Sequence, residues 1–169
     1  MKPHREGLVA PMNHLRLFVM LGCLLLPGSL LAQREKLPPE DLEVVEKQWP
    51  EAKRTSTGLR TQVLRPGQGP TPQKGDVVAV LYTGKLLDGT VFDQAQDAAK
   101  PFTVRVGRGQ VIEGWEEGLQ LLRAGERRLL IVPYELGYGT RGSPPKIPRR
   151  ATLIFEVELI AINPPPTAP

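Results

Sequence analysis

Residues 111–119 read Val-Ile-Glu-Gly-Trp-Glu-Glu-Gly-Leu, and this stretch predicts a short helix built around one tryptophan. Helical spacing places four apolar side chains on one face, namely Ile112, Trp115, Leu119 and Leu122. Gly114 and Gly118 leave other sides of the same helix bare. Trp115 therefore faces inward, and two interpretations are open: a helix that packs its apolar stripe on a sheet, and the floor of a binding pocket.

Four clusters of aromatic, glycine and acidic residues accompany this helix along the chain. They are Tyr82-Thr83-Gly84, the run Gly-Thr-Val-Phe-Asp at residues 89–93, Pro101-Phe102 and Tyr138-Gly139, with Phe155 near the end. Together with Val111, Ile112 and Trp115, their order resembles the pocket pattern of the FKBP-type peptidyl-prolyl isomerases. The resemblance covers about residues 57–160, and only the combination of motifs is specific.

Short strand-like runs alternate with turn signals through the same region. Such runs cover residues 59–64, 77–87 and 102–106, and Asp88-Gly89 is a hairpin signal. A last run is typical of a half-buried antiparallel strand, because Leu153, Phe155, Val157 and Leu159 alternate with Thr152, Ile154, Glu156 and Glu158. We expect an α+β fold with an antiparallel sheet of about five strands and one short amphipathic helix. The resemblance implies that the sheet is curved and wraps around the helix.

The chain of 169 residues has room for one domain with tails. We expect a signal peptide at residues 1–32, a short helical extension at 33–56, the isomerase domain at 57–161 and a Pro-rich disordered tail at 162–169. Within the extension, residues 38–47 predict a helix with proline at its start and acids in its first turn. Its apolar residues are Leu42, Val45 and Trp49. They could pack on the main domain, which is the interpretation we favour, or they could dock another protein.

The signal peptide prediction rests on a basic start, an apolar run at residues 17–26 and small residues before a cleavage point. Cleavage after Ala32 would export the mature chain to the periplasm. Two alternatives are open: a start at Met12 gives a more compact signal, and lipidation of Cys23 would anchor the protein in a membrane.

Cleavage after Ala32 would remove the one cysteine and both histidines of the chain. Disulfides, Cys-His zinc sites, thiol nucleophiles and imidazole bases are then excluded from the mature protein. Lys+Arg would fall from 22 to 19 and Asp+Glu from 18 to 17, giving a net charge of 19 − 17 = +2. We expect no nucleic-acid partner, no metal and no cofactor.

The resemblance implies a site that rotates a prolyl peptide bond without acid, base or nucleophile. It gives catalytic roles to four residues: Trp115 lies under the proline ring, the Ile112 N–H and the Tyr138 hydroxyl each bind a substrate carbonyl, and Asp93 favours the twisted amide electrostatically. It also implies substrate contacts from Tyr82, Phe92, Phe102, Val111, Ile147 and Phe155. Taken alone, Phe102 and Phe155 fit core positions, and Tyr138 fits a tight turn.

Three positions depart from the family pattern. Ala98 stands where well-studied eukaryotic members carry an arginine that pairs with the aspartate, which puts the orientation of Asp93 in doubt. In the loop 140–148, Ser143 replaces a frequent histidine and Lys146 an apolar residue. We expect retained activity, weaker macrolide binding and a preference of Lys146 for acidic neighbours of the proline. Unchanged selectivity in Lys146→Ile would contradict that preference.

Two functions compete. The first is an exported isomerase that speeds the folding of other proteins by binding extended X-Pro segments, with a bulky apolar X as the family implies. The second is a chaperone or peptide-binding module that uses the same groove without turnover. An isomerase should lose rate in Asp93→Val with its fold intact, whereas a binding module need not lose function. Since the extension is too short for the long dimerisation helices of some exported relatives, we expect a monomer.

Overall fold

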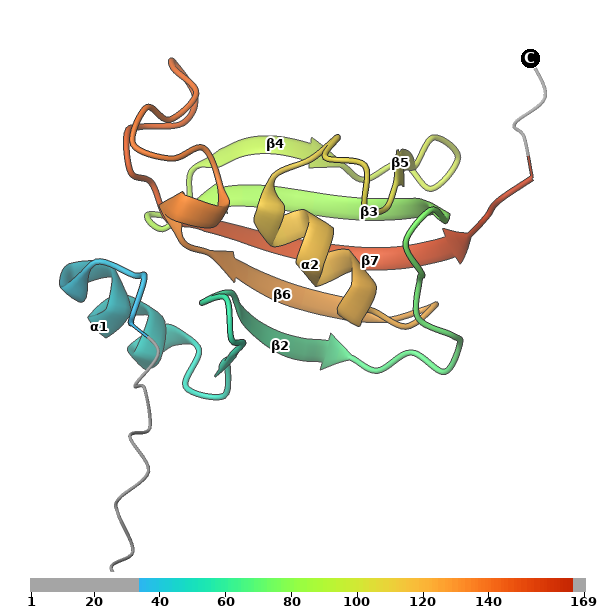
Figure 1. The fold of residues 1–169 in the computed structure, drawn as a ribbon, viewed down its shortest axis with the longest axis horizontal. Helices are drawn as coiled ribbons and strands as arrows, with labels where there is room; N and C mark the ends of the chain where they lie inside the picture. The colour runs from blue at the N-terminus through green and yellow to red at the C-terminus, as the bar shows by residue number, and fades with distance from the viewer. Residues whose placement is uncertain (1–33, 166–169) are drawn as a thin grey trace, which may run out of the picture. The chain divides into compact units, whose positions relative to one another are not determined.

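In the part of the chain that the structure describes, seven strands form one antiparallel sheet, and a short helix lies across one of its faces (Figure 1). The structure, a computed structural model, describes residues 34–165. The strands are β1 (Lys53–Arg54), β2 (Arg60–Arg65), β3 (Val77–Leu86), β4 (Val91–Ala95), β5 (Phe102–Arg105), β6 (Arg127–Val132) and β7 (Leu153–Ile162). The helices are α1 (Pro39–Gln48), α2 (Glu113–Leu121) and the 3-10 helix η1 (Tyr134–Leu136). The expected α+β fold, an antiparallel sheet with one short amphipathic helix, is confirmed, but the sheet has seven strands and not the expected five or so.

The strand order is β1-β2-β6-β7-β3-β4, and β5 also pairs with β3. The last strand of the chain therefore lies in the middle of the sheet. The sequence runs did not indicate β6, because its residues 129–132 are apolar on both faces and lack the alternation of a half-buried strand. The structure shows why both faces are apolar: a helix covers each of them.

Helix α2 contacts β6 through its glycines. A Cβ atom added at Gly114 would lie 2.6 Å from Cγ1 of Val132, and one added at Gly118 would lie 2.6 Å from Cδ1 of Leu130. The two glycine positions, which carry no side chain, are thus where the helix comes closest to the sheet. This close approach also points the Trp115 side chain toward the concave face of the sheet, where the residue is 4% exposed.

Helix α1 covers the opposite face of β6. Because side chains alternate along a strand, Leu129 and Ile131 point away from α2. They form a second apolar cluster with Leu37, Val45, Ala52 and Ile154. Val45 is fully buried, and Leu42 and Trp49 pack partly buried against this cluster. The extension therefore packs on the main domain, as we favoured, and it buries Ile154 on the face of β7 that was expected to meet solvent.

The predictions for the two ends of the chain fall largely outside the described residues. The signal peptide, the alternative start at Met12 and the lipidation of Cys23 all lie there, as does the end of the tail from residue 166. At the other boundary, β7 continues to Ile162, and the Asn163 side chain accepts a hydrogen bond from the Val77 amide at 2.9 Å. Within residues 34–165, no helix is both long and apolar enough to cross a membrane.

The tight contact between α2 and β6 predicts that Gly114→Ala destabilises the protein, although alanine is the better helix former by about 1 kcal/mol. The added methyl group would meet the stiff, β-branched Val132, and overpacking of this kind costs about 1–3 kcal/mol. Urea unfolding measures the change. Gln120→Ala, at an exposed position of the same helix, is the control and should change the free energy of unfolding by less than about 0.5 kcal/mol. Equal stability of wild type and Gly114→Ala would contradict the predicted contact.

Candidate active site

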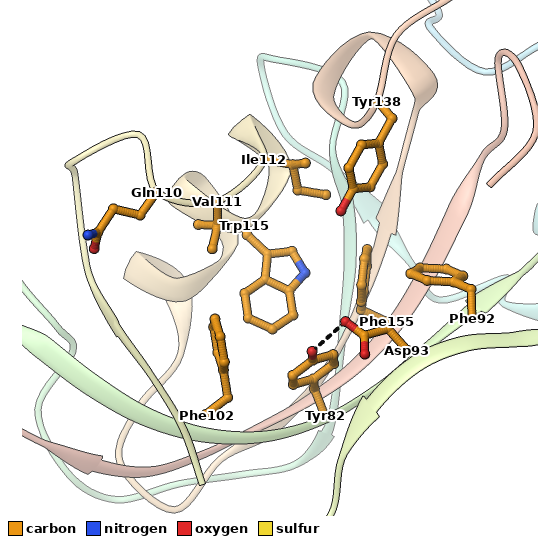
Figure 2. A pocket seen from close by; sticks show the side chains of 10 residues that line it. All are labelled: Tyr82, Phe92, Asp93, Phe102, Gln110, Val111, Ile112, Trp115, Tyr138 and Phe155. Carbon is orange, nitrogen blue, oxygen red and sulfur yellow. Dashed lines mark hydrogen bonds between the residues drawn. The ribbon is translucent and has the colours of Figure 1, made fainter. Parts of the chain in front are cut away.

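Aromatic rings packed edge to face form the base of a pocket on the concave side of the sheet (Figure 2). The Trp115 ring lies at its centre, with centroid distances of 4.9 Å to Tyr82, 5.3 Å to Phe155 and 6.0 Å to Phe102. Phe92 packs on Phe155 at 5.5 Å, with the ring planes at 90°. Edge-to-face pairs are favourable beyond the area that they bury, so the rings hold one another in place. The pocket has a volume of about 230 Å³.

The strand order brings these rings together from distant parts of the sequence. Tyr82 comes from β3, Phe92 and Asp93 from β4, and Phe155 from β7, which pairs with β3. Gly84 of β3 makes room for them, because a Cβ atom there would lie 2.8 Å from carbons of both Phe155 and Phe92. A side chain at this position would therefore displace the rings of Phe92 and Phe155, which line the pocket.

Asp93 is held by two hydrogen bonds. The Tyr82 hydroxyl donates to Oδ2 at 2.7 Å, and the Gln94 amide donates to Oδ1 at 3.0 Å. None of the ion pairs between residues 34 and 165 involves this carboxylate. The doubt raised by Ala98 about the orientation of Asp93 is thus resolved by a neutral partner, the tyrosine, in place of an arginine.

The end of β4 is fastened to β3 by a further side chain. Nε2 of Gln96 donates to the Tyr82 carbonyl oxygen at 2.8 Å and contacts Oγ1 of Thr83 at 2.7 Å. Gln96 therefore links the loop after Asp93 to the strand that carries the Tyr82 ring. Nothing in the sequence motifs marked Gln96 for this role.

Both tyrosines of the pocket remain protonated hydrogen-bond donors at neutral pH. Burial raises the pKa of Tyr82, and its hydrogen bond to Asp93 raises the pKa further, because both disfavour the phenolate. Burial of the hydroxyl also raises the pKa of Tyr138, with a smaller contribution from the negative charge of Asp93. The Tyr138 side chain nevertheless lies at the pocket rim, where the residue is 42% exposed.

The start of α2 supplies a backbone donor. Ile112 is the N-cap, and its carbonyl oxygen accepts hydrogen bonds from the amides of Trp115 at 2.9 Å and Glu116 at 3.1 Å. Its own N–H has no acceptor among the hydrogen bonds of the described residues. Glu116 fixes the preceding loop, because its carboxylate accepts hydrogen bonds from the amides of Gly107 at 2.5 Å and Gly109 at 2.7 Å.

The indole N–H of Trp115 is a second donor without a protein acceptor. It is buried, and no oxygen of residues 34–165 accepts a hydrogen bond from it. Figure 2 shows this nitrogen and the Tyr138 hydroxyl turned toward the same part of the pocket, with Asp93 on its other side. Leaving a buried donor unpaired costs free energy, which a bound acceptor would recover.

Nine of the ten residues predicted for the site line this pocket: Tyr82, Phe92, Asp93, Phe102, Val111, Ile112, Trp115, Tyr138 and Phe155. Ile147 does not line it. That side chain is 4% exposed and belongs to the main core, while its backbone pairs with Ser143. Gln110 lines the pocket and was not predicted, because a polar residue after a glycine turn gives no signal of its own. Phe102 lies at the rim, 37% exposed.

The raised pKa of Tyr82 predicts how stability changes at alkaline pH. An unfolded tyrosine ionises near pH 10, so below about pH 10 the hydroxyl is protonated in both states and its contribution is complete. Above about pH 10 only the unfolded state loses the proton, and stability falls until the folded tyrosine also ionises. Urea unfolding of wild type between pH 9 and 11 should show this fall, and Tyr82→Phe should show a shallower one. Identical slopes would contradict the prediction.

Comparisons with known proteins agree with this geometry. Residues 69–160 match the family of the FKBP-type peptidyl-prolyl cis-trans isomerase. The chain is 57% identical over 91 residues to human peptidyl-prolyl cis-trans isomerase FKBP2, covering 54% of this chain and 64% of that protein. It is 47% identical over 107 residues to FK506-binding protein 1A of Aspergillus fumigatus, covering 63% of this chain and 96% of that protein. The match thus spans less than two thirds of the FKBP2 length.

Solved structures are similar as well. The crystal structure of FkpA from Escherichia coli is 40% identical with a TM-score of 0.66, over 75% of this chain and 59% of that one. A peptidyl-prolyl cis-trans isomerase from Pseudomonas syringae pv. tomato is 34% identical with a TM-score of 0.65, over 74% of this chain and 92% of that one. Because the matched segment holds every strand that builds the pocket and helix α2 beneath it, the chain belongs to the FKBP-type peptidyl-prolyl cis-trans isomerase family.

Proposed function

We propose that this protein catalyses cis-trans isomerisation of X-Pro peptide bonds in extended polypeptide segments. The observation that carries the proposal is the aromatic pocket over Trp115, bordered by the free N–H of Ile112, the Tyr138 hydroxyl and the Asp93 carboxylate. An apolar floor suits the proline ring, and the two rim donors suit the carbonyl groups on either side of it. Membership of the family supports the same activity.

The chemistry asks for no acid, base or nucleophile. Rotation about the prolyl bond breaks amide resonance, and the uncatalysed barrier is about 18–20 kcal/mol. A site lowers this barrier if it binds the twisted amide more tightly than either planar form. A pocket floored by Trp115 surrounds the bond with few waters. The fixed N–H of Ile112 stabilises the twisted state without reorganising, while the Tyr138 hydroxyl binds a neighbouring substrate carbonyl. Asp93, held by the Tyr82 hydroxyl, places a fixed negative charge at the rim.

Replacing Asp93 tests this mechanism. We expect Asp93→Val to lower kcat/KM toward a Leu-Pro-Phe peptide by roughly tenfold to a hundredfold, since a preorganised electrostatic contribution is lost. The substitution also frees the Tyr82 hydroxyl, so circular dichroism must first show that the variant is folded. The measurement is the cis-to-trans rate of the peptide.

Asp97→Asn is the control for Asp93→Val, because it removes another carboxylate from the loop after β4. The Asp97 side chain is exposed and accepts a hydrogen bond from the Ala99 amide, which asparagine can also accept. This variant should keep the wild-type rate. If folded wild type does not accelerate the peptide at all, the alternative of a non-catalytic chaperone or peptide-binding module replaces the proposal.

The proposed substrates are X-Pro segments of exported proteins, and the proposed location is the periplasm. The support is the basic and apolar character of residues 1–32, with Ala32 as the cleavage point. The alternative is a lipid anchor on Cys23. Intact-mass spectrometry of the protein from its native cells tests both: an N-terminus at Gln33 supports export, an acylated Cys23 supports the anchor, and an unprocessed N-terminus contradicts both.

Macrolide inhibitors are proposed as a second class of ligand for the same pocket. The support is the similarity to a protein named FK506-binding protein 1A. Lys146 and Ser143 are exposed in the loop that follows Tyr138, so differences in macrolide affinity from other members should arise at this rim and leave the aromatic floor unaffected.

A further inference from the structure

The segment before the family match is packed against the face of the sheet opposite α2. The match begins at residue 69, yet residues 35–48, here called the brace, are fixed on the sheet. Val45 is fully buried and Leu37 is 4% exposed, both against β6 and β7. The Glu35 carboxylate accepts hydrogen bonds from the amides of Lys36 and Leu37, each at 3.0 Å, and from Arg60 at 2.9 Å. The brace is thus an ordered part of the fold.

One contact of the brace lies at the C-terminal end of the loop that follows Tyr138. This loop, residues 139–150, is here called the flap. Oγ1 of Thr152 donates to Oδ2 of Asp41 at 2.6 Å, and Thr152 is only 3% exposed. A hydroxyl bonded to a carboxylate at this distance is a strong, charge-assisted hydrogen bond. Thr152 sits between the flap and β7, so this bond fixes the point where the flap returns to the sheet.

A second contact lies at the other end of the flap. Nζ of Lys36 is 3.5 Å from Oε2 of Glu135, which belongs to η1, three residues before Tyr138. Both side chains are about one third exposed, so this ion pair is the weaker anchor. A cleft of about 610 Å³ lies between the brace, η1 and the C-terminal end of the flap, and both residues of the Lys36–Glu135 ion pair line it.

A few backbone hydrogen bonds connect both ends of the flap to Tyr138. The Arg150 amide donates to the Gly139 carbonyl oxygen at 3.2 Å, which joins the two ends of the flap. The Gly139 amide donates to the Tyr134 carbonyl oxygen at 2.7 Å, and the Gly142 amide to that of Tyr138 at 3.0 Å. The ring of Tyr138 therefore takes its position from a short closed loop, and the two residues that the brace contacts, Glu135 and Thr152, lie just outside its ends.

We propose that the brace positions Tyr138 for substrate binding, with Asp41 as the main positioning residue and Lys36 as a secondary one. The proposal rests on the proposed function, since it assigns a consequence for substrate binding to the placement of the Tyr138 hydroxyl. Under this proposal, a segment outside the family match helps to position a residue of the active site.

The test uses Asp41→Ala, Thr152→Val and the double variant, with Glu43→Ala as the control. Glu43 is exposed on the same helix, and its side chain makes no hydrogen bond or ion pair within residues 34–165. KM and kcat are measured with the Leu-Pro-Phe peptide, and hydrogen exchange is followed at the amides of residues 138–150. Exchange reports on the flap whether or not the protein turns substrate over. Circular dichroism shows that each variant is folded.

We expect Asp41→Ala to raise KM roughly threefold to tenfold with kcat within about twofold, because Tyr138 binds the substrate in the ground state and the transition state alike. Exchange should accelerate in the flap and stay unchanged in β3 and β4. The double variant should be no worse than either single one, since both remove the same bond. Thr152→Ser should retain wild-type behaviour, because it keeps the hydroxyl.

Two outcomes would overturn the proposal. One is wild-type KM together with wild-type flap exchange in Asp41→Ala. The other is faster exchange across the whole domain at unchanged KM, which would mean that the brace only stabilises the fold. Absence of isomerase activity in wild type would instead refute the proposed function, and the exchange data would still decide whether the brace orders the flap.

Discussion

The close approach of α2 to β6 is the constraint on which the rest of the structure depends. It exists because Gly114 and Gly118 present no side chain to Val132 and Leu130. Because the helix lies so near the sheet, the indole of Trp115 is directed to the concave face of the sheet. The rings of Tyr82, Phe102 and Phe155 then pack against its edges and faces. Pocket and core are made by the same contacts, so the floor of the site is as rigid as the fold itself.

The polar groups of the site lie at the rim of the pocket, around the apolar floor, and each is held in one orientation. Asp93 is aimed by Tyr82, the Ile112 amide is presented by the first turn of α2, and Tyr138 follows the short helix η1. Each group takes its position from a neighbouring residue or element, and Tyr82 both lines the pocket and holds Asp93. Glu116 and Gln96 belong to this supporting set, since they fasten the loops on either side of the site. Such support is what keeps donors preorganised for a transition state.

Much of this could be predicted from sequence, and the failures have physical reasons. The strand-like runs and the helical stripe through Trp115 predicted the α+β fold class, and the resemblance to the FKBP-type isomerases implied most of the residues that line the pocket. Strand β6 was missed because α1 and α2 cover both its faces and remove the alternation. Ile147 was placed at the pocket although it is buried in the core, because an apolar side chain in a loop carries no information about which way it turns. Contacts between residues far apart in the sequence, such as Asp41 with Thr152, leave no local pattern at all.

The central position of β7 has a consequence for how the domain is made. Within residues 34–165, one half of the sheet, β1-β2-β6, and the other half, β3 with β4 and β5, are joined only through this strand. Because β7 follows all the other described strands in sequence, neither half has its partner until residues 153–162 have been synthesised. Folding therefore has to wait for pairings that are far apart in sequence, which slows the search for the native topology. A chain truncated before Leu153 would lack the strand that unites the sheet, so the domain should assemble as one cooperative unit and not in successive pieces.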